Sequence, residues 1–147
     1  MGFQSDLNLI KWRLHLRSPI EHVYAALATD DGRASFWAET AVARDGVIHF
    51  VFPDGQTWDG AILRAEPPHT FSVHYFGGST ATFTLSADEQ GNTELTLTDA
   101  GVSAAYRAEV IAGWVSVLMA LKAAVDFGVD LRNHARQRTW DTGYVEN

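Results

Sequence analysis

The sequence opens with a strict alternation of apolar and polar side chains. Residues 10–17 place Ile10, Trp12, Leu14 and Leu16 on one face and Lys11, Arg13, His15 and Arg17 on the other. This period of two predicts a strand with one buried and one solvated face. Between residues 39 and 99, turn sequences such as Asp45-Gly46 separate runs rich in valine, isoleucine, threonine and aromatic residues, which predicts antiparallel hairpins. Six strands fit this region, at 39–44, 46–52, 56–65, 70–76, 80–88 and 92–99.

Two short helices are predicted between the first strand and the second. The segment Ser18-Pro19-Ile20-Glu21 has the order of an N-cap serine, a first-turn proline and a capping-box glutamate. It therefore predicts the start of a short helix. Asp30 or Asp31 is expected to cap a second short helix, which carries Phe36 and Trp37.

The longest helical pattern runs from about Ala104 to about Asn133. One apolar stripe follows it, made of Val110, Trp114, Val117, Leu118, Leu121 and Val125. Burying these side chains at roughly 1.5–3 kcal/mol each contributes on the order of 9–18 kcal/mol before entropy is subtracted. We therefore expect this helix to lie on the sheet. Gly113, at the edge of the stripe, is expected to mark a close approach to the helix backbone.

Length and composition narrow the picture further. A chain of 147 residues is close to the most common domain size, so we expect a single domain at 1–134 and a tail at 135–147 that packs on it. A net charge of -7 argues against a nucleic-acid or membrane partner. The lack of cysteine excludes disulfides, thiolate metal sites and a cysteine nucleophile. The segment Met1–Asp6 has no signal-peptide pattern, and we expect a cytoplasmic protein.

The order of these elements is similar to that of a known family. Together with the segments 18–24, 36–37, 60–68 and 113–122, it resembles the Hsp90-ATPase-activator-homologue-like (AHSA1-like) branch of the START/Bet v 1-like (SRPBCC) superfamily, over residues 8–132. The resemblance implies an α+β helix-grip fold, in which a seven-stranded antiparallel sheet curls around a long C-terminal helix. Many members of the superfamily hold an apolar molecule between sheet and helix. Function varies widely among them, so the resemblance implies a site and not a reaction.

One feature of the family is not expected here. The eukaryotic Hsp90 activators combine this domain with a separate N-terminal domain that binds Hsp90, and nothing of that kind fits before residue 8. We therefore do not expect the chain to act directly on Hsp90.

Aromatic residues supply most of the candidate cavity wall. Those expected around it are Trp37, Phe50, Tyr75, Phe83 and Trp114, together with Leu118. Such a lining suits a flat or elongated apolar ligand with one or two polar groups. The alternative is that these side chains only pack the core. Trp37 and Tyr75 are the stronger candidates because each has a polar tip that needs a partner or a wet edge.

Titratable residues give a weaker signal. The six histidines show neither HxH nor HExxH spacing, so we expect no metal site and no cofactor. His49 and His74 are out of phase with the aromatic residues of their strands and are expected on the outer face. Asp59 alternates with Trp58 and is kept as a candidate cavity residue. If it points inward, an apolar ligand beside it would raise its pKa and let it act as a general acid.

A second apolar patch is predicted near the end of the long helix. Phe127 and Leu131 fall outside the main stripe. Either Trp140 and Tyr144 fold back over this patch, or a second copy of the chain covers it and forms a homodimer. We hypothesise that the tail covers it.

Three functions remain open at this point. The leading hypothesis is non-catalytic binding of an apolar or aromatic small molecule against Trp37, Tyr75 and Trp114. The first alternative is a cyclase-like or dehydratase-like enzyme that uses Asp59, Tyr75 or a histidine in the same cavity. The second is a chaperone-associated or stress-response interaction module, which would need an exposed apolar patch near Phe127.

Overall fold

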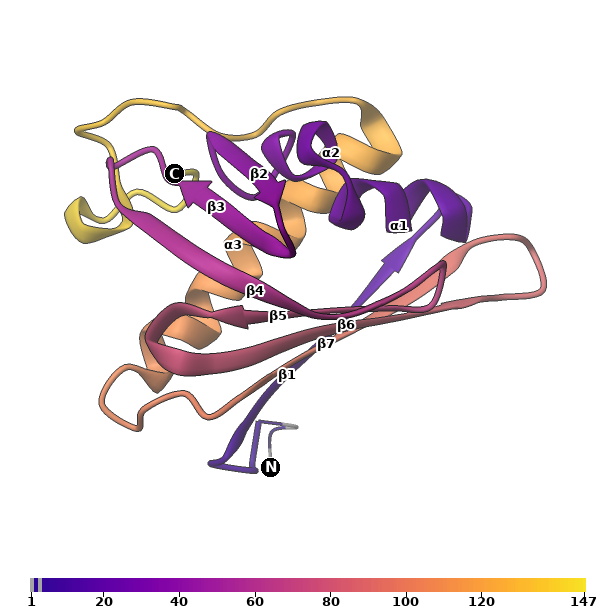
Figure 1. Ribbon diagram of the computed structural model, residues 1–147, viewed down its shortest axis with the longest axis horizontal. Helices are drawn as coiled ribbons and strands as arrows, with labels where there is room; N and C mark the ends of the chain where they lie inside the picture. Colours follow the sequence, from indigo (N-terminus) through magenta and orange to yellow (C-terminus); the bar gives the residue numbers. More distant parts are fainter. Residues whose placement is uncertain (1, 3) are drawn as a thin grey trace.

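A seven-stranded antiparallel sheet with the strand order β1-β7-β6-β5-β4-β3-β2 forms most of the fold (Figure 1). The computed structural model describes residue 2 and residues 4–147, so Met1 and Phe3 of the N-terminal segment lie outside the described residues. The strands are β1 (Leu9–Leu16), β2 (Thr40–Arg44), β3 (Val47–Val51), β4 (Thr57–Glu66), β5 (Thr70–Tyr75), β6 (Ser79–Ala87) and β7 (Thr93–Ala100). All seven predicted strands are present, and each end lies within one residue of its predicted position.

The first short helix is present as predicted, but its cap is not. The helix α1 (Ile20–Ala28) begins directly after Pro19, and no side chain caps it. The Ser18 hydroxyl instead donates toward Asp126 Oδ1 at 2.8 Å and the Val125 carbonyl at 3.1 Å. The predicted capping box is therefore wrong, because Ser18 ties the end of β1 to the end of the long helix.

The second short helix brings an aromatic residue into the core. The helix α2 (Asp30–Ala34) is capped by Thr29, whose Oγ1 accepts a hydrogen bond from the Gly32 N–H at 3.0 Å. Both aspartates predicted as caps lie in its first turn instead. Phe36 and Trp37 follow the helix rather than belonging to it. The turn after α2 thus directs Trp37 into the space between the sheet and the long helix.

The long helix α3 (Arg107–Phe127) lies within the curl of the sheet (Figure 1). Its inward face buries Trp114, Val117, Leu118 and Leu121, while Val110 and Val125 pack at the edge of the core. The helix is shorter than predicted because Gly128 adopts a left-handed conformation (φ 66°) and ends it. Length and apolar composition alone would suit a membrane span, yet α3 is the core helix of this domain.

The curl of the sheet is concentrated in β4. Residues 57–61 of this strand pair with β3, while residues 62–66 pair with β5 across an irregular register. Beyond the last residue pair of β4 and β5, the Trp58 indole N–H donates to the His74 carbonyl at 3.0 Å. The sheet can therefore curl around α3 (Figure 1).

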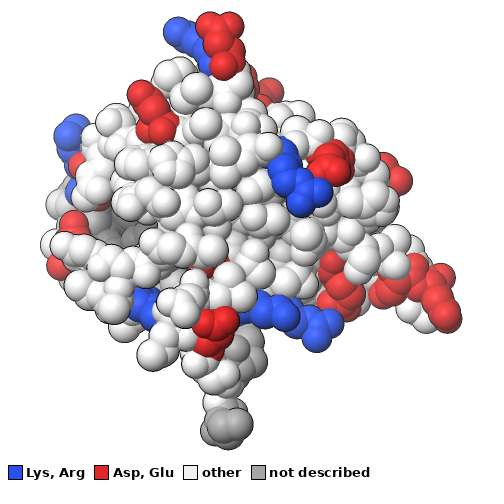
Figure 2. Space-filling model, turned by 60° about the horizontal axis from the view of Figure 1, so that its bottom comes forward, with Lys and Arg blue, Asp and Glu red and all other residues white. Residues whose placement is uncertain are grey.

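Charged side chains of both signs are scattered over the surface shown in Figure 2. No continuous patch of lysine and arginine lies on that face.

Candidate ligand site

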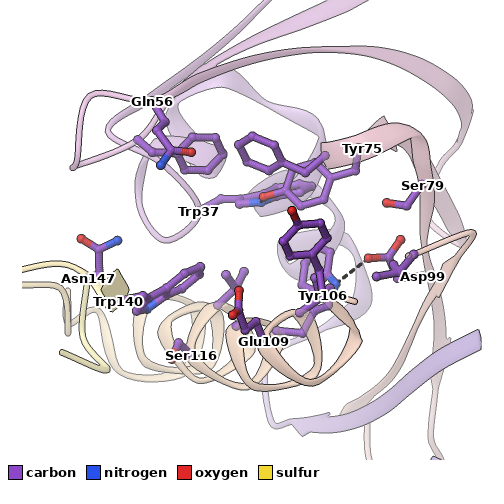
Figure 3. A pocket seen from close by; sticks show the side chains of 18 of the residues that line it. Trp37, Gln56, Tyr75, Ser79, Asp99, Tyr106, Glu109, Ser116, Trp140 and Asn147 are labelled. Atoms are coloured by element: carbon purple, nitrogen blue, oxygen red, sulfur yellow. Dashed lines mark hydrogen bonds between the residues drawn. The ribbon is translucent and has the colours of Figure 1, made fainter. Parts of the chain in front are cut away.

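A cavity of about 620 Å³ lies between the curled sheet and the first half of α3. Trp37, Tyr75 and Trp114, three of the residues predicted from the sequence, line it. Ser79 and Asp99 lie at one end of the view in Figure 3, and Gln56, Trp140 and Asn147 lie at the other. The cavity thus has a polar inner end and aromatic walls.

Three further predicted residues support the wall without facing the cavity. Phe50, Phe83 and Leu118 are buried in the core behind it. The ring centroids of Phe50 and Phe83 lie 5.0 and 5.4 Å from that of Trp37. Packing on two sides fixes the Trp37 indole, so these residues shape the site through their neighbour.

The assignment of Asp59 to the cavity is wrong. Its side chain is 68% exposed and lies on the outer face of β4, where its Oδ1 lies 2.8 Å from His49 Nδ1. Trp58 takes the other face of the strand and packs against Phe76. Alternation along the strand therefore separates Asp59 from the cavity, while His49 lies on the outer face as predicted.

Trp37 and Tyr75 are joined by a hydrogen bond within the cavity wall. The Trp37 indole N–H donates to the Tyr75 hydroxyl oxygen at 3.0 Å. Burial raises the pKa of Tyr75, so its phenol stays protonated at neutral pH. Among the described residues no acceptor receives the Tyr75 O–H proton, which leaves a hydrogen-bond donor inside the cavity.

Asp99 is the main functional candidate that sequence reasoning missed. Its side chain is 1% exposed, and its Oδ2 accepts a hydrogen bond from the Trp114 indole N–H at 2.9 Å (Figure 3). Its Oδ1, together with the buried Ser79 hydroxyl, has no hydrogen-bond partner within the described part of the chain. Burial raises the pKa of Asp99, and the Trp114 indole N–H and the nearby Ser79 hydroxyl offset part of that rise.

The alternation of inward and outward residues along β7 predicts that Asp99 points inward. Leu95 and Leu97 point inward from β7, so the next inward position is residue 99. Asp99 is the last residue of the strand predicted at 92–99, and that prediction gives its side chain no face. A carboxylate that continues an apolar stripe is unusual enough to mark a candidate site.

The tail lies against the cavity and not against the end of α3. Trp140 lines the cavity, and a Cβ at Gly113 would lie 3.3 Å from its ring, so the close approach predicted at Gly113 is made by this indole. Phe127 and Leu131 remain exposed, and the Arg17 guanidinium lies 4.2 Å from the Phe127 ring centroid. The hypothesis that the tail covers this patch is therefore wrong.

A buried arginine holds the beginning of the tail in place. Arg132 donates to the carbonyls of Ala34 and Ala38 at 2.7 and 2.8 Å and is paired with Asp130. His134 contacts Asp130 and Glu39 at 2.7 and 2.6 Å. These contacts connect the tail to the segment that carries Trp37.

Comparisons with known proteins agree with this architecture. The family model described as Activator of Hsp90 ATPase homolog 1-like protein matches residues 17–126. The solved structure of SSP2350 from Staphylococcus saprophyticus is 22% identical with a TM-score of 0.73, and the match covers 84% of this chain and 96% of that one. The Aha1 dimer from Colwellia psychrerythraea is 24% identical with a TM-score of 0.72, covering 82% and 97%. An AHSA1-like protein from Aeromonas hydrophila is 21% identical with a TM-score of 0.70, covering 82% and 93%. A search of curated proteins gives no significant match.

Proposed function

Because the chain belongs to the Activator of Hsp90 ATPase homolog 1-like family, we propose that it binds an apolar small molecule with an aromatic body in the cavity between the sheet and α3, without converting it. The observation that carries this proposal is the cavity of about 620 Å³ with indole and phenol walls. A volume of this size falls in the usual range for small-molecule sites. Packing on Trp37 from behind gives the ligand a preformed wall.

The enzymatic alternative receives less support from the site. Of the groups considered for it, Asp59 lies on the outer face, and no histidine lines the cavity in the described part of the chain. Tyr75 does line the cavity, but its raised pKa makes it a poor proton donor or acceptor at neutral pH. Ligand binding therefore remains the function that this arrangement favours.

A pair of substitutions on one helix tests the proposal. Val110 lines the cavity, whereas Val115 is exposed on the opposite face of α3. Wild-type protein is titrated with N-phenyl-1-naphthylamine, a neutral apolar probe whose fluorescence rises in an apolar site. Val110→Trp should fill part of the cavity and weaken binding at least tenfold, which corresponds to about 1.4 kcal/mol. Val115→Trp should leave the affinity within about twofold of wild type.

The matched pair separates cavity binding from adsorption to the surface. Equal affinities in wild type and Val110→Trp would place the probe elsewhere and contradict the proposal. Lack of binding by wild type, extended to a set of neutral aromatic compounds of different lengths, would contradict it as well. Circular dichroism and denaturation of both variants control for loss of the fold.

A further inference from the structure

The charged residues that line the cavity all have the same sign. They are Asp54, Asp99, Glu109 and Asp141, and no lysine, arginine or histidine lines it within the described residues. Arg136 packs against Gly55, beside Asp54, but does not belong to the lining. The cavity therefore presents acidic groups at its mouth and one at its inner end.

Asp99 differs from the other acidic residues of the lining because it is buried. Asp99 and Ser79 are each 1% exposed, and neither Asp99 Oδ1 nor Ser79 Oγ has a partner within hydrogen-bond distance among the described residues. The two side chains are nevertheless close enough for the Ser79 hydroxyl to lower the pKa of Asp99. Both side chains line the same end of the cavity (Figure 3). A buried carboxylate oxygen without a partner is costly, so a ligand that donates a hydrogen bond to it gains more here than at a solvated site.

The aromatic walls favour the same kind of ligand. Tyr75 and Trp114 lie beside each other, with ring centroids 5.3 Å apart, and both line the cavity. The negative faces of such rings attract a cation, most strongly where water is excluded. An ammonium group near Asp99 would therefore find a carboxylate and aromatic rings in one place.

Resting on the proposed function, we propose that the cavity selects a hydrophobic cation: a primary or secondary amine whose ammonium group donates to Asp99 Oδ1 and Ser79 Oγ while its aromatic body packs along Trp37, Tyr75 and Trp114. The acidic residues at the mouth attract the cation, and Asp99 holds it. A carboxylate ligand is rejected because it would meet Asp99 with like charge. A neutral ligand of the same shape binds through its apolar body but without the ion pair.

Three probes with one body and different head groups test the selectivity. They are 4-phenylbenzylamine, 4-phenylbenzyl alcohol and biphenyl-4-carboxylate, titrated into the full chain by isothermal calorimetry near neutral pH. Wild type should bind the amine at least tenfold more tightly than the alcohol, a difference of about 1.4 kcal/mol, and the carboxylate most weakly. Asp99→Asn should weaken binding of the amine at least tenfold and so remove its preference over the alcohol. Asp59→Asn, which removes an equal charge from the outer face, should keep the preference.

Each outcome has one meaning. If wild type binds the alcohol at least as tightly as the amine, the proposal that the cavity selects a cation is wrong, while the proposed function still stands. If Asp99→Asn keeps the preference, the assignment to Asp99 is wrong. If wild type binds none of the three probes and no other neutral aromatic compound, the proposed function itself fails. Because the first comparison uses wild type alone, it holds even where Asp99→Asn does not fold.

Discussion

Asp99 should lower the stability of the ligand-free protein, and replacing it with asparagine measures by how much. Oδ2 accepts from the Trp114 N–H at 2.9 Å, and an asparagine oxygen can accept the same hydrogen bond. The amide nitrogen then takes the position of the unpartnered Oδ1, beside the Ser79 hydroxyl, to which it can donate. Asp99→Asn therefore removes the buried charge, keeps the shape and pairs the free atoms.

The difference in unfolding free energy between Asp99→Asn and wild type depends on pH, and burial of the carboxyl group determines its sign. Burial raises the folded-state pKa of Asp99 above its ordinary value of 3.8, so the folded protein binds this proton more tightly than the unfolded chain does. The stability gained from that proton is fully present below pH 3.8 and is lost as the pH rises through the raised folded value. Below this window the variant and wild type should differ little. Above it, Asp99→Asn should be more stable by about 1–3 kcal/mol, the cost of an unpaired buried polar group.

Urea denaturation of both proteins across the pH range measures this difference. Each kcal/mol also raises the Tm by about 2–4 °C for a chain of this length. Asp59→Asn serves as the control, because Asp59 is exposed on the outer face. A variant that is less stable than wild type at every pH, or a difference that does not change with pH, would refute the reasoning. Asp99 would then be a structural residue whose charge is satisfied in the folded chain.

Three further substitutions test how the tail is held. Arg132→Met should destabilise the domain by about 2–4 kcal/mol in urea denaturation, because two backbone carbonyls lose their donors. Hydrogen bonds to the carboxylates of Glu39 and Asp130 raise the pKa of His134. The stability that this residue contributes is therefore present below pH 6.5 and is lost as the pH rises through the raised pKa. His134→Gln should flatten the pH dependence of the urea midpoint in that window. Gly113→Val should displace the Trp140 ring, which lies 3.3 Å from the Cβ position, and increase quenching of tryptophan fluorescence by iodide; unchanged quenching would show that the indole does not rest there.

The strands could be predicted closely because local signals define both their interior and their ends. Residues 10–17 alternate without interruption, and glycine-containing turns bound most of the later strands. Helix ends were predicted less well. Ser18 stands in the sequence context of an N-cap, yet its hydroxyl donates a hydrogen bond to Asp126, which is far away in the sequence. Gly128 did carry the signal for the end of α3, since glycine favours the left-handed conformation that stops a helix.

Part of the cavity lining could be predicted from the sequence, and the errors have different causes. Trp37, Tyr75 and Trp114 line the cavity because aromatic residues with polar tips suit such a wall. Asp59 lies on the outer face because side chains alternate along β4 and its neighbour Trp58 takes the inward position. The sequence alone does not say which of these two neighbours faces inward. The position of Trp140 depends on contacts made far away in the sequence, so no local pattern could reveal it.

Asp99 interrupts the apolar pattern of the inward face of β7, and this interruption points to the candidate site more directly than the regular positions do. The inward face of β7 is apolar at Leu95 and Leu97, and a third apolar residue at position 99 would complete the core at no electrostatic cost. The chain instead places a carboxyl group there and supplies one donor, the Trp114 indole, for two oxygens. The needs of folding do not explain why a buried carboxyl group has a hydrogen-bond partner for only one of its two oxygens. We infer that a ligand donor completes the set formed by the remaining oxygen and the Ser79 hydroxyl beside it. The acidic lining and the aromatic walls favour a cation in that role.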